Sequence, residues 1–235
     1  MWNGKMKAVT FSFDDGVIQD RRFVDILNKY GLRGTFNLNS AKLGYRSSGR
    51  EVNGHMVYYS KVEPYEIREL YRGHEIASHT LAHPDLLELD DENVIRQVEE
   101  DRRLLSKLAG YEVIGFAYPF GSYDERIIKL IRENTGIKYA RATGSPRPLD
   151  LDFSEPLAYQ PTNYFANTEE MINTAKRLIE MKPDKPQLMY IWGHTYQLDE
   201  ATQVTWDDFE EFCALISGKD DIFYGTNAEV FEELL

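Results

Sequence analysis

The stretch Lys7-Ala8-Val9-Thr10-Phe11-Ser12-Phe13-Asp14-Asp15-Gly16 decides the fold class. Residues 7–13 alternate in polarity and are rich in β-branched and aromatic side chains, a pattern that predicts a strand. Two adjacent carboxylates and a glycine follow at its end. Gly16 permits turn conformations in which both carboxylates face one pocket, one to bind a cation and the other to accept a proton from water. On its own, Asp-Asp-Gly is also ordinary chemistry for a solvated turn.

Strands and helices alternate along the rest of the chain. Periodicity predicts further strands at residues 34–38, 74–78, 113–117, 138–142, 187–192 and 221–224, and helices at 19–30, 64–71, 91–108, 124–134, 168–181, 206–216 and 228–235. Gly31 and Gly110 follow two helices as stop signals, and Pro64 stands in the first turn of another. Seven such strands predict an α/β fold with a parallel sheet, either closed as a barrel or open and doubly wound. No repeat or linker interrupts the pattern, so residues 1–235 are expected to form a single domain.

Composition narrows the class of partner. The chain is 42% hydrophobic and 28% charged, as globular proteins are, and its net charge is −12. Such an acidic chain repels phosphate backbones, so nucleic acid is not expected as a partner. No stretch approaches the length of about 20 apolar residues that spans a bilayer, and the oligomeric state is left open. The start lacks a secretory segment, which predicts a cytoplasmic protein, or an exported one if a signal peptide has been trimmed.

Histidines follow the third predicted strand in the sequence Ser78-His79-Thr80-Leu81-Ala82-His83-Pro84. Because Pro84 pushes the residue before it away from helical angles, we expect His79 at the strand end and His83 in the following turn. In parallel α/β folds, functional residues gather at the carboxyl ends of strands. Two histidines with a carboxylate from the first strand form a common zinc triad that leaves a position open for water. A surface or core histidine pair is the alternative.

Two more strand ends carry suitable residues. The fourth is followed by Phe116-Ala117-Tyr118-Pro119-Phe120-Gly121-Ser122-Tyr123-Asp124, which offers a rigid aromatic wall and a backbone N–H for a developing oxyanion. The same stretch also fits a packing loop in which Asp124 caps the next helix. His194 emerges from the strand at 187–192, where partial burial can tune a histidine, although a single one is more often structural. The lone Cys213 is interpreted as a small buried hydrophobe.

These stretches, in this order, resemble the motifs of the polysaccharide deacetylase family, carbohydrate esterase family four. The resemblance rests on residues 10–16, 79–83 and 116–121 and on the stretch ending at His194. It implies a distorted (β/α) barrel of about seven parallel strands, with a divalent metal, usually zinc, at its carboxyl face. By the same resemblance, the functional residues are Asp14 as general base, His194 as general acid, Asp15, His79 and His83 as metal ligands, and Phe120 as the oxyanion donor through its backbone N–H. We also expect the aromatic side chains of Tyr118 and Trp192 to lie beside the substrate.

One position departs from the family pattern. Many members carry in the third motif an arginine that holds the catalytic aspartate, and Ala117 stands at that position here. Our hypothesis is that Arg141, at the end of the predicted strand 138–142, supplies this charge. In the family an acidic residue usually tunes the histidine that acts as the acid, here His194. Asp150, Asp152 and Glu155 lie close to one candidate region for this partner, and none of them is compelling.

The predicted function is therefore a metal-dependent hydrolase that removes N-acetyl groups from an acetylated amino sugar or glycan. Relatives of this family cleave other amides, cyclic ureides or O-acetyl esters, and these substrates stay open. A catalytically silent carbohydrate-binding domain on the same fold is the alternative from another class. The presence of both Asp14 and His194 argues against it, because binding alone needs neither a base nor an acid.

Overall fold

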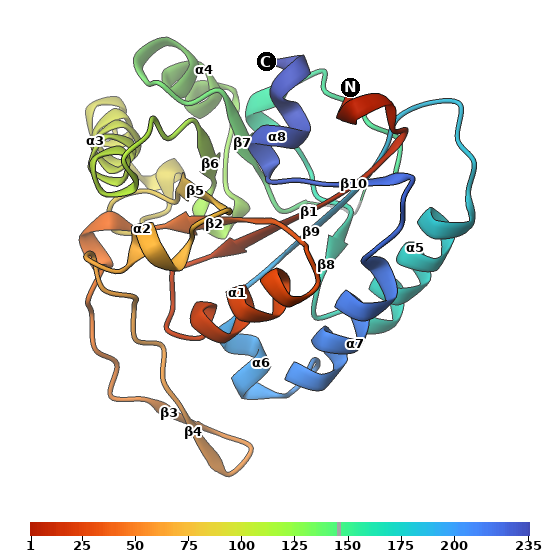
Figure 1. The fold of residues 1–235 in the computed structure, drawn as a ribbon. Coiled ribbons are helices and arrows are strands. Elements are labelled where there is room, and N and C mark those ends of the chain that lie inside the picture. Colours follow the sequence, from red (N-terminus) through yellow and green to blue (C-terminus); the bar gives the residue numbers. More distant parts are fainter. Residues whose placement is uncertain (145–146) are drawn as a thin grey trace.

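A curled parallel sheet forms the centre of the computed structural model, which describes residues 1–144 and 147–235 (Figure 1). Its strands follow the order β7-β6-β5-β2-β1-β9-β8, and β10 pairs with the first residues of β1. Their bounds are β1 (Lys7–Asp14), β2 (Gly34–Leu38), β5 (Glu75–Ser78), β6 (Gly115–Ala117), β7 (Tyr139–Arg141), β8 (Asn163–Tyr164), β9 (Gln187–Gly193) and β10 (Ile222–Tyr224). The predicted α/β barrel class is confirmed, with every pair in this sheet parallel.

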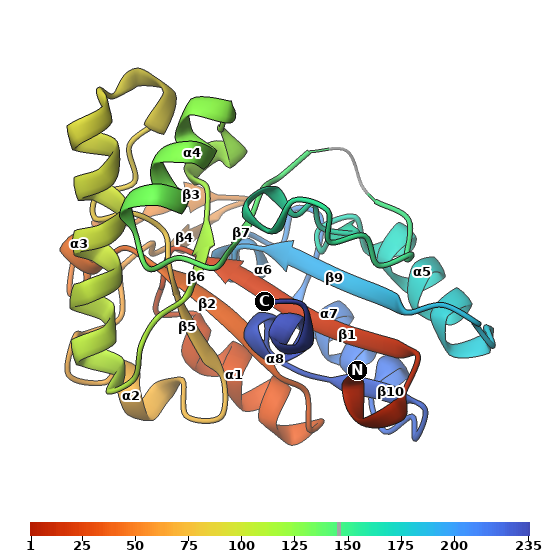
Figure 2. The same cartoon turned by 90° about the horizontal axis from the view of Figure 1, so that it is seen from above.

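Most of the helices cover the outside of the sheet, as the view from above shows (Figure 2), whereas the last one packs on its concave side. Their bounds are α1 (Asp20–Lys29), α2 (Ile67–Leu70), α3 (Asp91–Ala109), α4 (Glu125–Asn134), α5 (Thr168–Glu180), α6 (Tyr196–Glu200), α7 (Trp206–Ile216) and α8 (Asn227–Phe231). Local signals fix several ends. Asp90 caps α3, Gly110 ends it at φ 82°, and Asp124 caps α4 by accepting from the Ile127 N–H at 2.8 Å. The predicted stop at Gly110 and the capping role considered for Asp124 are both confirmed.

Alternation along β1 divides the core into two sides. Val9, Phe11 and Phe13 pack outwards in the cluster that includes residues of α1, α5 and α7. Residues of the opposite parity face the concave side, where Ala8 packs with α8 residues at the amino end. Towards the other end this side becomes polar: the Thr10 hydroxyl donates to Asn227 at 2.8 Å, and Asp14 is the last residue of the strand. The register therefore brings Asp14 to the carboxyl end of the concave face.

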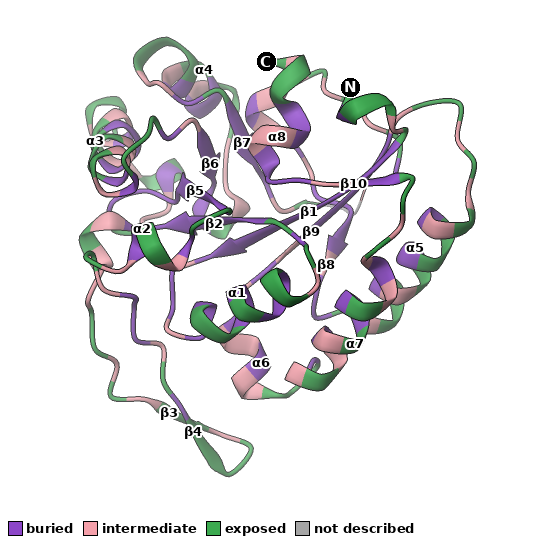
Figure 3. Ribbon diagram, in the orientation of Figure 1, coloured by how far each residue is buried: buried purple, intermediate pink, exposed green. Residues whose placement is uncertain are grey.

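The strands and α-helices missed are short, and the helices predicted at 64–71 and 228–235 extend beyond α2 and α8. The hairpin of β3 (Arg50–Val52) and β4 (His55–Val57), the two-residue β8 and the short α6 carry too few residues for a periodic pattern. Figure 3 shows that the hairpin is largely exposed, so it lacks the apolar alternation of a half-buried strand. The helix predicted at 64–71 begins only at Ile67, because Pro64 lies in a preceding turn.

No helix in the described part of the chain is both long enough and apolar enough to cross a membrane.

Candidate active site

A cavity of about 320 Å³ opens at the carboxyl ends of β1, β5, β6 and β9. These four strand ends and that of β7, all far apart in sequence, supply its lining: Asp14, Asp15, His79, His83, Tyr118, Phe120, Gly121, Thr143, Trp192, His194 and Tyr196. Eight of the nine residues singled out from the sequence are in this lining, and Arg141 lies directly behind Asp14. A larger, shallow hollow along α5 brings together no comparable set of histidines and carboxylates.

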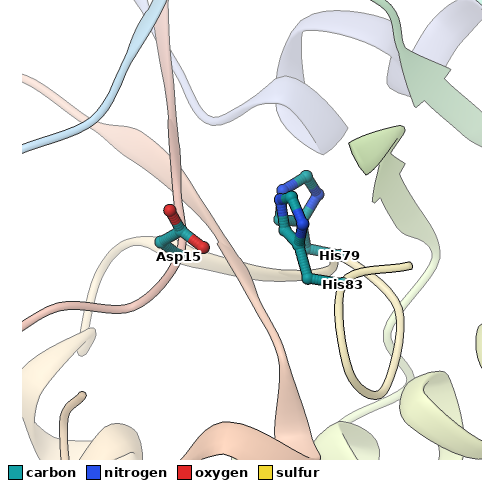
Figure 4. A group of neighbouring side chains, drawn as sticks. All are labelled: Asp15, His79 and His83. Carbon is teal, nitrogen blue, oxygen red and sulfur yellow. The ribbon is translucent and has the colours of Figure 1, made fainter. Parts of the chain in front are cut away.

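Asp15, His79 and His83 form the one cluster with metal-ligand spacing found in the described residues. One ligand atom from each lies within 4.8 Å of the others, and Figure 4 shows the Asp15 carboxylate facing the two imidazoles. The Nδ1 atom of His79 is 2.7 Å from the Ala117 carbonyl oxygen, an acceptor that fixes the proton there and leaves Nε2 free. Two imidazoles and a carboxylate, with one imidazole already oriented, fit a divalent ion such as zinc.

Burial keeps both histidines ready for a cation. It lowers the pKa of His79 to about 4 and lowers the pKa of His83, so both rings are neutral near pH 7. Burial raises the pKa of Asp15, but the nearby Lys61 ammonium and the histidines outweigh it, and the net pKa is lowered. All three ligands therefore present lone pairs without first having to lose a proton at neutral pH.

Asp14 is held in place by two neighbours. The Arg141 Nη2 atom donates to both carboxylate oxygens, at 2.7 and 2.5 Å, and Asn37 donates to Oδ1 at 2.8 Å. Both Asp14 and Arg141 are almost fully buried. Burial raises the pKa of Asp14, yet Arg141 and the site histidines pull it below its usual range. Asp14 is therefore an oriented, ionised carboxylate at the wall of the cavity.

His194 closes the cavity on the side of β9. Its Nε2 lies 3.9 Å from Asp14 Oδ2, and its ring packs between Trp192 and Tyr196. The three acidic candidates for its partner are all engaged elsewhere: Asp150 with Gln187, Asp152 with Arg147, and Glu155 with Arg132. None of them is the partner. The buried Nδ1 of His194 has no hydrogen-bond acceptor among residues 1–144 and 147–235.

Four residues of the cavity loops have left-handed backbone conformations without being glycine. Their φ angles are 82° at Asp15, 68° at Thr80, 60° at His83 and 58° at Phe120. Such conformations cost energy for side-chain-bearing residues and gather at functional sites. His83 directly precedes Pro84, so the two histidines are not on one helix: His79 follows β5 and His83 lies beyond it in the next bend. Only glycine fits at position 121, because a Cβ there would lie 1.8 Å from the Thr143 hydroxyl.

The aromatic residues differ in how far they reach the solvent. Phe120 is 68% exposed, with its ring against that of His83. Trp192 is half-buried, packs at a tilt against the Tyr164 ring and lies under the Arg141 guanidinium, 5.0 Å from the ring centre. Tyr118 is buried and its hydroxyl donates to the Leu157 carbonyl, so only its ring contributes to the wall.

Sequence reasoning missed Asn37, Thr143, Tyr196 and Lys61. Asn37 pairs with Asp14 across the β1–β2 register, and the Lys61 ammonium lies 3.1 Å from Asp15 Oδ1. Asn37 sits near the end of a predicted strand and could have been found by the strand-end rule. Lys61 stands in no motif, and only the folded path of the chain brings it to the site.

Comparison with known proteins decides the family. A family model described as polysaccharide deacetylase matches residues 3–140, more than half of the 235 residues. The chain belongs to the polysaccharide deacetylase family. The matched part of this deacetylase-family chain includes the metal-ligand triad, Asp14 and Phe120, whereas Arg141 and His194 lie beyond it.

Solved structures of the family share the fold. A Mycobacterium smegmatis protein described as a polysaccharide deacetylase has a TM-score of 0.68 at 19% identity, over 98% of this chain and 90% of that one. A family 4 carbohydrate esterase from Streptomyces lividans, solved with acetate, has a TM-score of 0.57 at 13% identity, over 94% and 93%. The peptidoglycan-N-acetylmuramic acid deacetylase PdaC of Bacillus subtilis is 26% identical over 123 residues, 52% of this chain. The matched part of our chain covers only 23% of the length of PdaC.

Proposed function

We propose that this protein is a metal-dependent deacetylase that removes N-acetyl groups from an amino sugar or a glycan. One observation carries the proposal: a single cavity is lined by a metal-ligand triad, a carboxylate held by an arginine, and a histidine 3.9 Å from that carboxylate. This is the set that hydrolysis of an amide requires: a Lewis acid, a base for water and an acid for the leaving amine. Family membership supports the same reaction.

Asp15, His79 and His83 would hold the ion, which we expect to be zinc. When bound there, the ion supplies a Lewis acid that polarises the acetyl carbonyl and lowers the pKa of water. The residues around it do the rest. Asp14 accepts the proton of the attacking water, because Arg141 and Asn37 fix its carboxylate and keep it ionised.

His194 gives a proton to the leaving amine, from its place in the cavity lining beside Asp14. Its proximity to Asp14 lets the base and the acid address the same acetyl group. The backbone N–H of Phe120 is our proposed donor to the oxyanion. The exposed Phe120 ring, with Tyr196 and Trp192, offers aromatic faces on which a sugar ring can stack, and these faces support a carbohydrate substrate.

Acetate release tests the proposal. The zinc-loaded chain is incubated with N-acetylated amino sugars as monomers, oligomers and polymers, and with an O-acetylated xylan in parallel. We expect acetate from an N-acetylated substrate and loss of at least about 100-fold in Asp14→Asn, in line with the removal of a general base. Acetate from the xylan alone would move the assignment to an esterase. Bound zinc without acetate from any glycan would contradict the proposal.

A further inference from the structure

Lys61 reaches the metal-ligand triad by an unusual route. It lies between the β3–β4 hairpin and α2, in a segment that runs antiparallel beside the turn after β1. The Val17–Lys61 bridge and two backbone bonds, Ile18 N–H to the Ser60 carbonyl and Val62 N–H to the Gly16 carbonyl, both 2.9 Å, fix this path. The backbone of Lys61 is therefore anchored against the turn that carries Asp15.

The side chain of Lys61 is committed to Asp15. Its ammonium lies 3.1 Å from Asp15 Oδ1, and the two side chains are only 11% and 18% exposed. In the part of the chain that the structure describes, Asp15 is its one ion-pair partner. Because both groups are shielded from solvent, salt and water screen their interaction weakly.

When an ion occupies the triad, Asp15 faces two cations, of which the Lys61 ammonium belongs to the protein. An ammonium at 3.1 Å from one oxygen lies within a few ångströms of any ion bound by the same carboxylate, so the two positive charges repel each other. With Lys61 in place, the carboxylate is already neutralised before a metal arrives. The remaining ligands, His79 and His83, are imidazoles, so Asp15 is the only ligand of the triad that brings a negative charge.

We propose that Lys61 is the built-in counter-ion of the metal-free site and that it weakens metal binding by competing for Asp15. This inference rests on the metal site of the proposed function. A merely orienting role, in which the ammonium steadies a ligand, has the opposite sign, because loss of an orienting partner weakens metal binding. In both roles Lys61 acts through Asp15 and does not touch the substrate. A change in metal affinity on removing its charge distinguishes competition from orientation.

The experiment measures zinc affinity without substrate. The full chain is stripped of metal and titrated with zinc against a chromogenic chelator at fixed pH and ionic strength. In Lys61→Met the zinc Kd should fall by about tenfold or more, since the repulsion is gone while the ligands remain. Lys61→Arg keeps the charge and should bind zinc as the wild type does.

Lys7→Met is the matched control. Lys7 is also buried and ion-paired, with Asp221 at 2.7 Å, but it lies at the opposite end of β1. Its replacement should leave the zinc Kd unchanged. If Lys61→Met does not give a folded protein by thermal melting, Lys61→Gln takes its place with the same expectation.

Equal or weaker zinc binding in the folded, uncharged variant overturns the inference, and leaves the proposed function intact if the wild type binds zinc and releases acetate. Zinc binding that tightens in a protein releasing no acetate supports the inference and contradicts the function. A wild type that binds no zinc overturns both.

Discussion

At the scale of single residues, Arg141 and Asp14 form a contact that crosses the curled sheet. Arg141 ends β7 at one edge, Asp14 ends the central β1, and three strands lie between them. Removing one partner of a buried ion pair leaves the other uncompensated, which costs about 3–5 kcal/mol. We therefore expect this pair to matter for both folding and turnover.

Replacing Arg141 tests its role directly. In Arg141→Met, Asp14 loses its oriented cation, and we expect turnover to fall by about 100-fold or more while zinc content is unchanged. Arg132→Met removes a solvent-exposed pair with Glu155 and serves as the control. Activity that survives in Arg141→Met, measured as acetate release, would rule out the proposed role.

Asp20 gives the site a pH-dependent neighbour. It is fully buried, and the Thr195 and Tyr71 hydroxyls donate to it at 2.5 and 2.6 Å. Burial raises its pKa from 3.8 to about 7. A folded pKa above the unfolded value means that the protonated form favours folding, so this contribution is full below about pH 4 and is lost as pH rises through about 7.

Denaturation of the metal-free protein at several pH values between 4 and 8 measures this contribution. We expect the free energy of unfolding of the wild type to fall, relative to Asp20→Asn, by up to about 1.4 kcal/mol per pH unit across that window. Parallel curves for the two proteins would show that Asp20 stays ionised throughout.

Most of the candidate site could be identified from its residues alone, because each predicted residue stood at a strand end. His79, His83 and His194 are examples, and all three line the cavity. Lys61 could not be, since its contact with Asp15 depends on the path of the hairpin segment. The partner of His194 was sought near residue 150, whereas those carboxylates pair with other side chains.

At the scale of elements, the β3–β4 hairpin holds α6, the helix that begins two residues after His194. His55 contacts the Asp199 carbonyl oxygen at 2.7 Å, and the Tyr59 hydroxyl donates to Glu200 at 2.7 Å. The Tyr59 ring also packs on Tyr196, which lines the cavity. The hairpin therefore braces the loop that carries the proposed acid.

Tyr59→Ala tests this brace. Without the ring and hydroxyl, α6 and His194 are less well placed, and we expect kcat/KM for acetate release to fall by about tenfold. Zinc affinity should stay within about twofold, because none of the three ligands is touched. The neighbouring Tyr58→Ala is the control, since that side chain is 47% exposed. Equal activity in both variants would assign the hairpin no part in positioning.

The sequence predicts the long elements well and the short ones poorly. The helix expected at 91–108 is α3 (Asp91–Ala109), because three or more apolar turns and two capping signals coincide there. The hairpin strands have neither a long apolar pattern nor capping signals. The two-residue β8 forms by pairing with β9. Tertiary contact, rather than local preference, forms these elements.

At the scale of the whole molecule, the metal-ligand triad ties together loops that follow two different strands. A ligand that binds only the folded state stabilises it by about 2.7 kcal/mol when present at about 100 times its Kd. We expect zinc to raise the melting temperature of the metal-stripped chain and a chelator to reverse the rise. Asp15→Asn should abolish the response. A melting temperature that zinc does not change in the wild type would argue against a site at the triad.

Whether the parallel sheet curls into a barrel or stays open also depends on the whole chain. Alternation predicted parallel strands, but β1 lies between β2 and β9, whose sequence positions are about 150 residues apart. No local pattern encodes that neighbour relation. The family resemblance supplied the barrel instead, and the curled sheet agrees with it.

The left-handed residues around the cavity make the site a natural target for stability engineering. Thr80 and Phe120 have left-handed backbone conformations. Such a conformation costs a residue with a side chain about 1–2 kcal/mol, a penalty that glycine does not have. Selection for heat resistance alone should therefore favour glycine at these positions. Each gain there would loosen the geometry that brings histidine, carboxylate and aromatic wall together, so thermostability and turnover should trade off at these positions.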